Sequence, residues 1–436
     1  MRVAVIGSGI AGLGAARALA RLHDVVLYEA DHRLGGHAHT VEVADGEGSV
    51  AVDTGFIVYN EPNYPNLTAL FHELGVASEP SDMSFSVSLN DGAFEYRSRA
   101  GGLFAQPANL LRPRMWRMLS DFRRLCREAP DILAEDGQEP LGAFLDRRGY
   151  SQAFRAGMLL PMVAAIWSGG VDGVLDYPVA TLLRFLDNHA MLQMGNRPDW
   201  RTVTGGSRRY VGSIASGLTD IRVGTPVISV HRDVHAVTVR DAAGGVDLFD
   251  HVVMATHADT TLSILGADAG QQERRLLGSF GFQDNVAVLH RDPALMPERR
   301  RAWASWNYLT DERAAVQRET PVCLTYWMNR LQNLRTRVPV FVTLNPVREP
   351  RGVTSWFSYS HPQFDGSAVT TQRQLSSIQG VRRTWFCGAW TGYGFHEDGL
   401  RSGLEVAAAL GAAPRWWPQA REPESLTSVS AVGVRA

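Results

Sequence analysis

Hydrophobic and polar positions follow two different periods within the first thirty residues of the chain. A short apolar run at 3–6 leads into a glycine-rich turn, and an Ala/Leu-rich run with helical spacing follows it. A second apolar run then ends in Leu27-Tyr28-Glu29. The pattern predicts a strand, a helix and a second strand that ends in an acidic residue.

Three glycines at fixed spacing lie in the first turn. Gly7 allows a tight turn, Gly9 lets the backbone approach a pyrophosphate, and Gly12 lets the helix pack closely on the strand. The helix N-terminus offers free N–H groups to phosphate, and Glu29 lies where an acid holds a ribose hydroxyl. We therefore predict a dinucleotide site. The alternative, a glycine-rich turn without a ligand, leaves Glu29 and the spacing unexplained.

Composition narrows the class of protein. The 436 residues suffice for two domains, and the formal net charge of -2 gives no basic field that would favour nucleic acid. The three cysteines are far apart and show no metal-ligand spacing, and the chain contains no lysine. No apolar run reaches the roughly 18 residues of a membrane span. We expect a cytoplasmic protein, soluble or peripheral at the inner face of the cytoplasmic membrane, without a nucleic-acid partner.

The region 103–127 is amphipathic and rich in arginine. One interpretation is a surface helix that docks on anionic lipid. The other, which is the more common case, is a helix whose apolar face packs on the core while its arginines are solvated.

Large aromatic residues are frequent between 262 and 379. We interpret some of them, Trp327 and Trp356 included, as walls of a pocket for an apolar substrate. Ordinary core strands must account for most of the others.

A second chemical segment lies near the C-terminus. A buried strand at 384–387 ends in a glycine turn at Gly388, and a second turn at 392–399 opens a helix. Trp390 and Phe395 lie in this segment and are candidates for contact with a substrate.

The N-terminal unit, followed by Arg33-x-Gly35-Gly36, resembles the FAD-binding fold of the flavin amine oxidase, phytoene desaturase and protoporphyrinogen oxidase superfamily. The C-terminal segment resembles the flavin motif of the same superfamily. The resemblance implies an α/β fold, in which a Rossmann-like FAD-binding domain of the glutathione reductase type is interleaved with an α+β substrate domain. The implied ranges are 1–61, 204–262 and 381–413 for FAD binding, 62–203 and 263–380 for the substrate domain, and 414–436 for a disordered tail.

The resemblance also implies which residues hold FAD. The glycine loop and its flanks would bind the ADP half, and the C-terminal motif would bind the flavin half. The implied cofactor-binding residues are Gly7, Gly9, Ile10, Ala11, Gly12, Glu29, Ala30, Arg33, Gly35, Gly36, His37, Thr54, Gly55, Phe56, Val227, Ala255, Thr256, Gly388, Ala389, Gly399, Leu400 and Ser402.

Candidates for proton transfer beside the flavin are His396 and Glu397. A helix-capping role for Glu397 and a packing role for His396 are the alternatives. His37 and His39 lie two residues apart but lack a third ligand, so no metal site is expected.

Three functions remain open at this point. Over its whole length the chain resembles a bacterial subgroup of flavoproteins that are often encoded beside cyclopropane-fatty-acyl synthase-like methyltransferases. This resemblance favours a desaturase or dehydrogenase that acts on a methyl-branched or otherwise modified fatty-acyl chain, by hydride transfer to flavin N5. A flavin amine oxidase is weakened by the missing lysine, and a non-catalytic FAD-binding protein is the third possibility.

Overall fold

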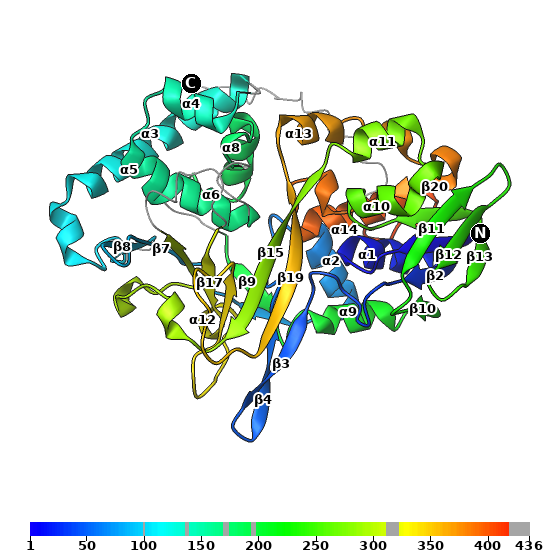
Figure 1. Ribbon diagram of the computed structural model, residues 1–436, viewed down its shortest axis with the longest axis horizontal. Coiled ribbons are helices and arrows are strands. Elements are labelled where there is room, and N and C mark those ends of the chain that lie inside the picture. The colour runs from blue at the N-terminus through cyan, green and yellow to red at the C-terminus, as the bar shows by residue number, and fades with distance from the viewer. Residues whose placement is uncertain (99–100, 136–138, 169–173, 193–197, 311–321, 418–436) are drawn as a thin grey trace, which may run out of the picture.

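A five-stranded parallel sheet is assembled from three separated stretches of the chain. The computed structural model describes residues 1–98, 101–135, 139–168, 174–192, 198–310 and 322–417. The sheet lies on the right in Figure 1, with neighbouring strands in parallel register. In spatial order, the strands are β10 (Asp220–Arg222), β2 (Asp24–Tyr28), β1 (Arg2–Ile6), β14 (His251–Met254) and β20 (Thr384–Phe386).

Alternating side chains of β1 face two different layers. Val3 and Val5 pack into a cluster with α1 (Ile10–Leu19) and α14 (His396–Ala409). Ala4 and Ile6 pack with the antiparallel strands β11, β12 and β13 and with α10. Both faces of β1 are buried, which explains its continuous apolar run. The bounds of the second layer are β11 (Val227–Arg232), β12 (Val237–Asp241), β13 (Val246–Phe249), α10 (Ala258–Leu265) and α11 (Gln271–Leu277).

A seven-stranded mixed sheet forms the second part of the molecule, left of centre in Figure 1. Its neighbouring strands are antiparallel except for β16 and β7, which run parallel. In spatial order, the strands are β19 (Ser355–Gln363), β15 (Gly281–His290), β18 (Phe341–Leu344), β17 (Leu324–Trp327), β16 (Trp306–Thr310), β7 (Phe85–Leu89) and β8 (Phe94–Arg97).

Helices from the middle of the chain cover one face of this sheet and share its core. The chain stays helical through Pro161, and a π-helical turn at Arg155–Leu159 precedes α6. Pro161 has no N–H to donate to the Gly157 carbonyl oxygen four residues earlier, and that oxygen accepts the Tyr96 hydroxyl at 2.8 Å. The helices are α3 (Pro113–Glu135), α4 (Leu141–Arg147), α5 (Gln152–Phe154), α6 (Leu160–Trp167) and α8 (Val179–Asn188).

Smaller elements connect the two parts. A hairpin projects downward in Figure 1, and a three-stranded sheet brings residues near 60, 80 and 200 together. The elements are β3 (Thr40–Asp45), β4 (Gly48–Asp53), β5 (Val58–Asn60), β6 (Ser78–Pro80), β9 (Trp200–Val203), α2 (Pro65–Leu74), α9 (Arg208–Ala215), α12 (Met328–Leu331) and α13 (Gly366–Gln372).

At two places, residues pack with a part of the molecule to which the predicted domain ranges do not assign them. Leu276, Leu277 and Phe280 belong to the cluster around the parallel sheet, although the range 263–380 assigns them to the substrate domain. The predicted tail also begins too early, because Trp416 packs against the N-terminal core and donates its indole N–H to Glu73. Residues 418–436 of that tail lie outside the described residues. The remaining boundaries stay predictions.

Within the described ranges, no helix is long and apolar enough to cross a bilayer.

His290 provides a test of the core of the seven-stranded sheet. It is fully buried, its Nδ1 accepts the Asp292 N–H at 3.0 Å, and its Nε2 contacts Thr343 Oγ1 at 2.7 Å. Burial lowers the pKa of His290 from 6.5 to about 4, so unfolding takes up a proton between these two values. Stability should therefore fall as pH drops below 6.5. Between pH 7 and 5 the loss from this group is about 2 kcal/mol.

The His290→Gln variant removes this titrating group. Urea unfolding at pH 7 and pH 5 should show a smaller loss of unfolding free energy in the variant than in the parent, by about 2 kcal/mol. Equal losses in the two proteins would contradict the assignment.

Candidate active site

A cavity of about 1170 Å³ is lined by residues from both parts of the molecule. Single-ligand pockets typically have about 300–1,000 Å³, so this one has room for a cofactor and a substrate together. At one end it is lined by the glycine turn after β1 and by Gly388 after β20. Both turns follow the carboxyl ends of parallel strands, where ligands bind in open α/β sheets.

The glycine turn leaves open space where a phosphate would lie. A Cβ placed on Gly9 meets no atom within 4 Å, whereas one on Gly12 would lie 1.9 Å from the Gly7 carbonyl oxygen. Gly9 is the N-cap of α1, and no side chain caps this helix. The free N–H groups of α1 therefore remain available to an anion.

Glu29 is fixed in the wall of the cavity. Its carboxylate accepts hydrogen bonds from Ser8 N at 2.8 Å, Ser8 Oγ at 2.5 Å and Asp31 N at 2.9 Å. A carboxylate held in this way presents a preorganised acceptor for a hydroxyl.

Fourteen of the predicted cofactor residues line the cavity. They come from both ends of the chain and from the strand ends between them. They are Gly7, Gly9, Ile10, Ala11, Glu29, Gly36, His37, Thr54, Gly55, Phe56, Ala255, Thr256, Gly388 and Ala389.

Other predicted cofactor residues support the lining from behind. Gly12 lets α1 pack, as described above. A Cβ on Gly35 would lie 2.5 Å from the Ala38 carbonyl oxygen, which makes Gly35 a packing glycine. Arg33 does not reach into the cavity: Nη1 donates to the Gly36 carbonyl oxygen at 2.8 Å and Nε pairs with Asp31 at 3.2 Å. Arg33, implied by the resemblance to bind the cofactor, therefore supports the loop and does not line the cavity.

Three predicted cofactor residues of the C-terminal motif also support the lining from behind and do not form it. They are Gly399, Leu400 and Ser402. Ser402 Oγ accepts the Gly388 N–H at 3.0 Å, so it shapes the turn and does not line the cavity. Leu400 is fully buried and packs on Gly14 of α1, and a Cβ on Gly399 would lie 2.9 Å from Ile10. The other two predicted residues are placed outside the lining: Val227 is buried in the second-layer core, and Ala30 is exposed.

His396 lines the cavity, but its environment argues against proton transfer. Its ring stacks on Phe56 with centroids 3.8 Å apart, and its Nε2 contacts the Tyr210 hydroxyl at 2.6 Å. Burial lowers the pKa of His396 from 6.5 to about 3, so the ring is neutral near pH 7. The ring is thus held as a neutral wall of the cavity, and its predicted role in proton transfer stays a prediction.

Glu397 is directed away from the cavity and caps a helix. Oε1 accepts the Asn66 N–H at 2.9 Å, and Oε2 accepts the Leu67 N–H at 3.0 Å. These two N–H groups belong to the first turn of α2 and have no partner within that helix. The predicted catalytic role of Glu397 is thus corrected to capping, which ties α14 to α2.

His257 and His361 are among the cavity residues that sequence reasoning missed. The His361 ring lies 5.2 Å from that of His37, and Asn285 Nδ2 contacts His361 Nδ1 at 2.9 Å. Burial lowers the pKa of His361 to about 4 and lowers that of His257 as well. Two signals were available: His257 lies three residues after the end of β14, and 357, 359 and 361 share one face of a strand.

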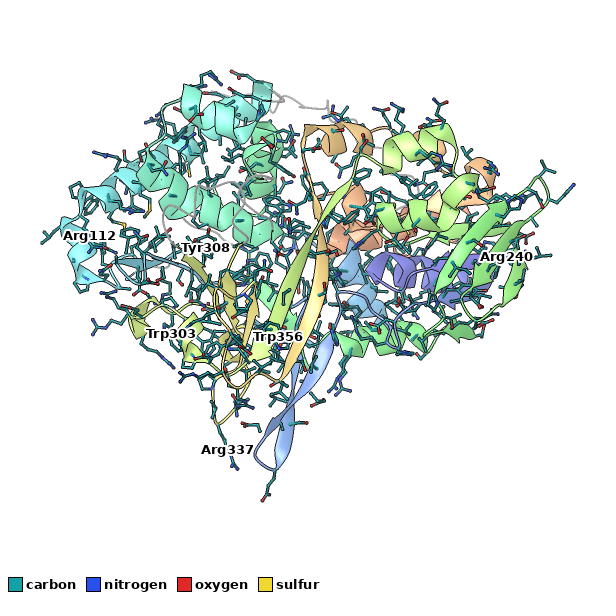
Figure 2. The ribbon with its side chains drawn as sticks, in the orientation of Figure 1. Arg112, Arg240, Trp303, Tyr308, Arg337 and Trp356 are labelled. Carbon is teal, nitrogen blue, oxygen red and sulfur yellow. The ribbon has the colours of Figure 1, made fainter. Side chains whose placement is uncertain are left out.

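The four predicted substrate residues separate into two pairs. Trp390 and Phe395 line the cavity. Trp327 instead packs edge-on against Trp303, labelled in Figure 2, with centroids 5.4 Å apart in a small cluster of its own. Trp356 is 51% exposed on β19. The substrate roles predicted for Trp327 and Trp356 are therefore wrong, because neither side chain reaches the cavity.

The lining fits FAD at both ends. Open space at Gly9, the fixed Glu29 carboxylate and the unpaired N–H groups of α1 suit the ADP half. His37 Nε2 is buried without a hydrogen-bond partner among the described residues, as expected for a polar atom that faces a ligand. The fold and this site define a dinucleotide-binding flavoprotein.

Comparison with known proteins gives the family. The model of the family "Flavin containing amine oxidoreductase" matches residues 10–291, so the chain belongs to this family. Membership confirms the predicted resemblance, identifies FAD as the cofactor and assigns the chain to a class of FAD-dependent oxidoreductases.

The individual relatives have low sequence identity to the chain. An L-amino acid dehydrogenase from Synechocystis sp. is 26% identical over 254 residues, which are 55% of this chain and 52% of the relative. The chain thus matches about half the length of that protein. A putrescine oxidase variant superposes with a TM-score of 0.69 at 15% identity, over 94% of this chain and 99% of its own. A CLA-producing fatty acid isomerase from P. acnes gives 0.67 at 16%, over 94% and 98%. These two structures confirm the predicted fold.

The open space at Gly9 leads to a test of the cofactor site. Gly9→Val should fold normally but lower the affinity for FAD at least about tenfold, because the branched side chain occupies the space of a phosphate. Titration of the apoprotein with FAD measures this change. Gly48→Ala is a matched control, since a Cβ there also meets no atom within 4 Å but lies in the β3–β4 hairpin. Unchanged affinity in Gly9→Val would place the cofactor elsewhere.

The capping role of Glu397 can be separated from catalysis. Glu397→Gln should lower the free energy of unfolding by about 1–2 kcal/mol, because one capping oxygen becomes an amide donor. The rate of flavin reduction by a working substrate should stay within about twofold of the parent. Glu405→Gln on the same helix is the control, as its side chain is 61% exposed. A large loss of rate without loss of stability would restore a catalytic role.

Proposed function

We infer that the protein is an oxidoreductase that removes hydrogen from a long apolar chain, such as a methyl-branched or otherwise modified fatty-acyl chain. The single observation that carries this proposal is an apolar lobe of the cavity, continuous with the flavin site. This lobe lies between the seven-stranded sheet and its covering helices. It is lined by Met83, Phe85, Tyr96, Leu103, Leu119, Phe122, Met158, Met162, Ala165, Ile166, Phe185, Met191, Trp306, Tyr326 and Leu344.

Charge in the lining argues against an ammonium substrate. Among the described lining residues, Glu29 is the only carboxylate, and Ser8 holds it at the ADP end. Arg123, on α3, is the single arginine of the lining within the part of the chain that the structure describes. A buried ammonium group needs a negative or hydrogen-bonding partner, whereas an acyl chain with an anionic head group matches both the apolar walls and Arg123.

The chemistry divides between cofactor and protein. FAD supplies the hydride acceptor for the C–H bond that breaks. Dehydrogenation also releases a proton, and the imidazole of His257, which lines the cavity, is the candidate to accept it. The pKa of His361, lowered to about 4 by burial, makes that side chain a weak base near pH 7.

Oxidation of an amine is the second candidate. The curated relative from Synechocystis sp. acts on L-amino acids by its name, and the fold is shared with putrescine oxidase as well as with a fatty acid isomerase. The aromatic side chains of Trp390 and Phe395 line the cavity near Gly388 and suit an amine as well as an alkyl chain. The chain has no lysine to place a water molecule there.

Anaerobic mixing of the FAD-loaded protein with candidate substrates tests the proposal. Methyl-branched fatty acids or phospholipids should bleach the visible absorbance of the flavin, and putrescine or L-amino acids should not. Bleaching by amines alone would overturn the fatty-acyl substrate. A flavin that stays oxidised with both classes would favour a non-catalytic FAD-binding protein.

A matched pair of variants locates the substrate. Ala165→Phe fills part of the apolar lobe and should raise KM for a long chain by about tenfold while FAD content stays unchanged. Ala134→Phe introduces the same ring at an exposed position of α3 and should leave KM unchanged. Equal KM values in the two variants would show that the lobe does not hold the substrate.

A further inference from the structure

A corner of the molecule exposes large apolar side chains. It comprises the 3-10 turn Pro107–Leu111 and the first half of α3, residues 113–127. Leu110, Leu111 and Trp116 are 49%, 88% and 52% exposed. The sequence left two interpretations open for 103–127, a helix that packs on the core and a helix that docks on lipid. Met115, Met118 and Leu125 pack into the core, whereas the N-terminal corner projects from the surface.

Hydrogen bonds and ring packing hold the corner in place. Trp116 donates its indole N–H to the Leu110 carbonyl oxygen at 2.9 Å, and its ring lies 6.0 Å from that of Phe104. Asn109 is fully buried and donates to the Glu95 carbonyl oxygen on β8 at 2.8 Å. The exposed leucines are therefore held outward by a turn that is anchored to the β7–β8 hairpin.

Unpaired positive charges lie along the helix that carries Trp116. Arg117, Arg123 and Arg127 are exposed and form no hydrogen bond or ion pair with any residue that the structure describes. Arg124, by contrast, pairs with Glu128 at 2.8 Å. The whole chain carries a formal charge of -2, so these cations form a local positive surface on a nearly neutral protein.

The corner is continuous with the cavity. Leu119, Phe122 and Arg123 of α3 line the cavity, and Arg123 is also exposed, so the cavity reaches the surface here. Trp116, Leu119 and Arg123 are spaced i, i+3 and i+7 and lie on one face of the helix. The corner is far from the parallel sheet: Figure 2 labels Arg112 at one end of the molecule and Arg240 of β12 at the other.

We propose that this corner docks on the surface of an anionic lipid bilayer, with Leu110, Leu111 and Trp116 inserted among the head groups. Unpaired arginines beside exposed Leu and Trp are the combination that binds such surfaces. A second copy of the chain fits less well, because two equally positive corners repel each other. Docking would place the mouth of the cavity against the membrane. The proposal concerns binding alone and stands whichever substrate is oxidised.

Co-sedimentation of the FAD-loaded full chain with vesicles tests the proposal. We expect binding to phosphatidylcholine vesicles that contain 30% phosphatidylglycerol, at least about tenfold weaker binding to pure phosphatidylcholine, and a decrease as salt rises. The Leu111→Ser/Trp116→Ser variant should bind at least about tenfold less. The Leu22→Ser/Leu248→Ser variant is the matched control, since those leucines are 65% and 60% exposed on the FAD-binding part, and it should bind like the parent.

A second pair of variants tests the charge. Arg117→Gln/Arg127→Gln should bind anionic vesicles at least about tenfold less, whereas Arg240→Gln should not change binding. Bound FAD and far-UV circular dichroism show that each variant is folded. No sedimentation of the parent with either vesicle would overturn the proposal. A parent that self-associates through the corner, with dimers lost in Leu111→Ser/Trp116→Ser and no vesicle binding, would also overturn it.

Discussion

Close backbone contact at the N-terminal glycine turn is the constraint on which the rest of the structure depends. A side chain at Gly12 would overlap the Gly7 carbonyl, so only glycine lets α1 lie this close to the turn. On its other side α1 meets α14, where a Cβ on Gly403 would lie 2.2 Å from the Ala11 carbonyl oxygen. The first helix is therefore fixed between strand and last helix. This arrangement leaves its N-terminal N–H groups directed at one end of the cavity.

The C-terminal segment serves architecture as much as chemistry. Ser402 fixes the turn at Gly388, and Glu397 caps α2 from a distant part of the sequence. His396 is packed between Phe56 and Tyr210. The role of a polar residue in this motif thus depends on which nearby backbone groups need a hydrogen-bond partner. Buried N–H groups of a helix terminus are costly to leave unpaired, so a nearby carboxylate is drawn to them.

The cavity joins two regions of different polarity. Its floor, at the ends of the parallel strands, offers N–H groups, a fixed carboxylate and neutral imidazoles, whereas its roof is formed by methionine and aromatic side chains of the covering helices. Burial lowers the pKa of His37, His361 and His396 and explains why these imidazoles stay neutral. An apolar chain can be desolvated there at no electrostatic cost, while a charged group cannot.

The sequence by itself determined the strand–turn–helix units at both ends, because glycine spacing and apolar periodicity are local and each has one physical use here. It therefore predicted a dinucleotide site, and the resemblance of both units to a flavoprotein family implied FAD as its ligand. Only the tertiary structure decided the rest. Alternation along β19 places Trp356 and Tyr359 on opposite faces, but only the tertiary structure decided that Tyr359 faces the cavity and Trp356 the solvent. Glu397 became a cap because α2, over 300 residues earlier, lies beside it. Such roles depend on which distant groups become neighbours, and no local pattern encodes that.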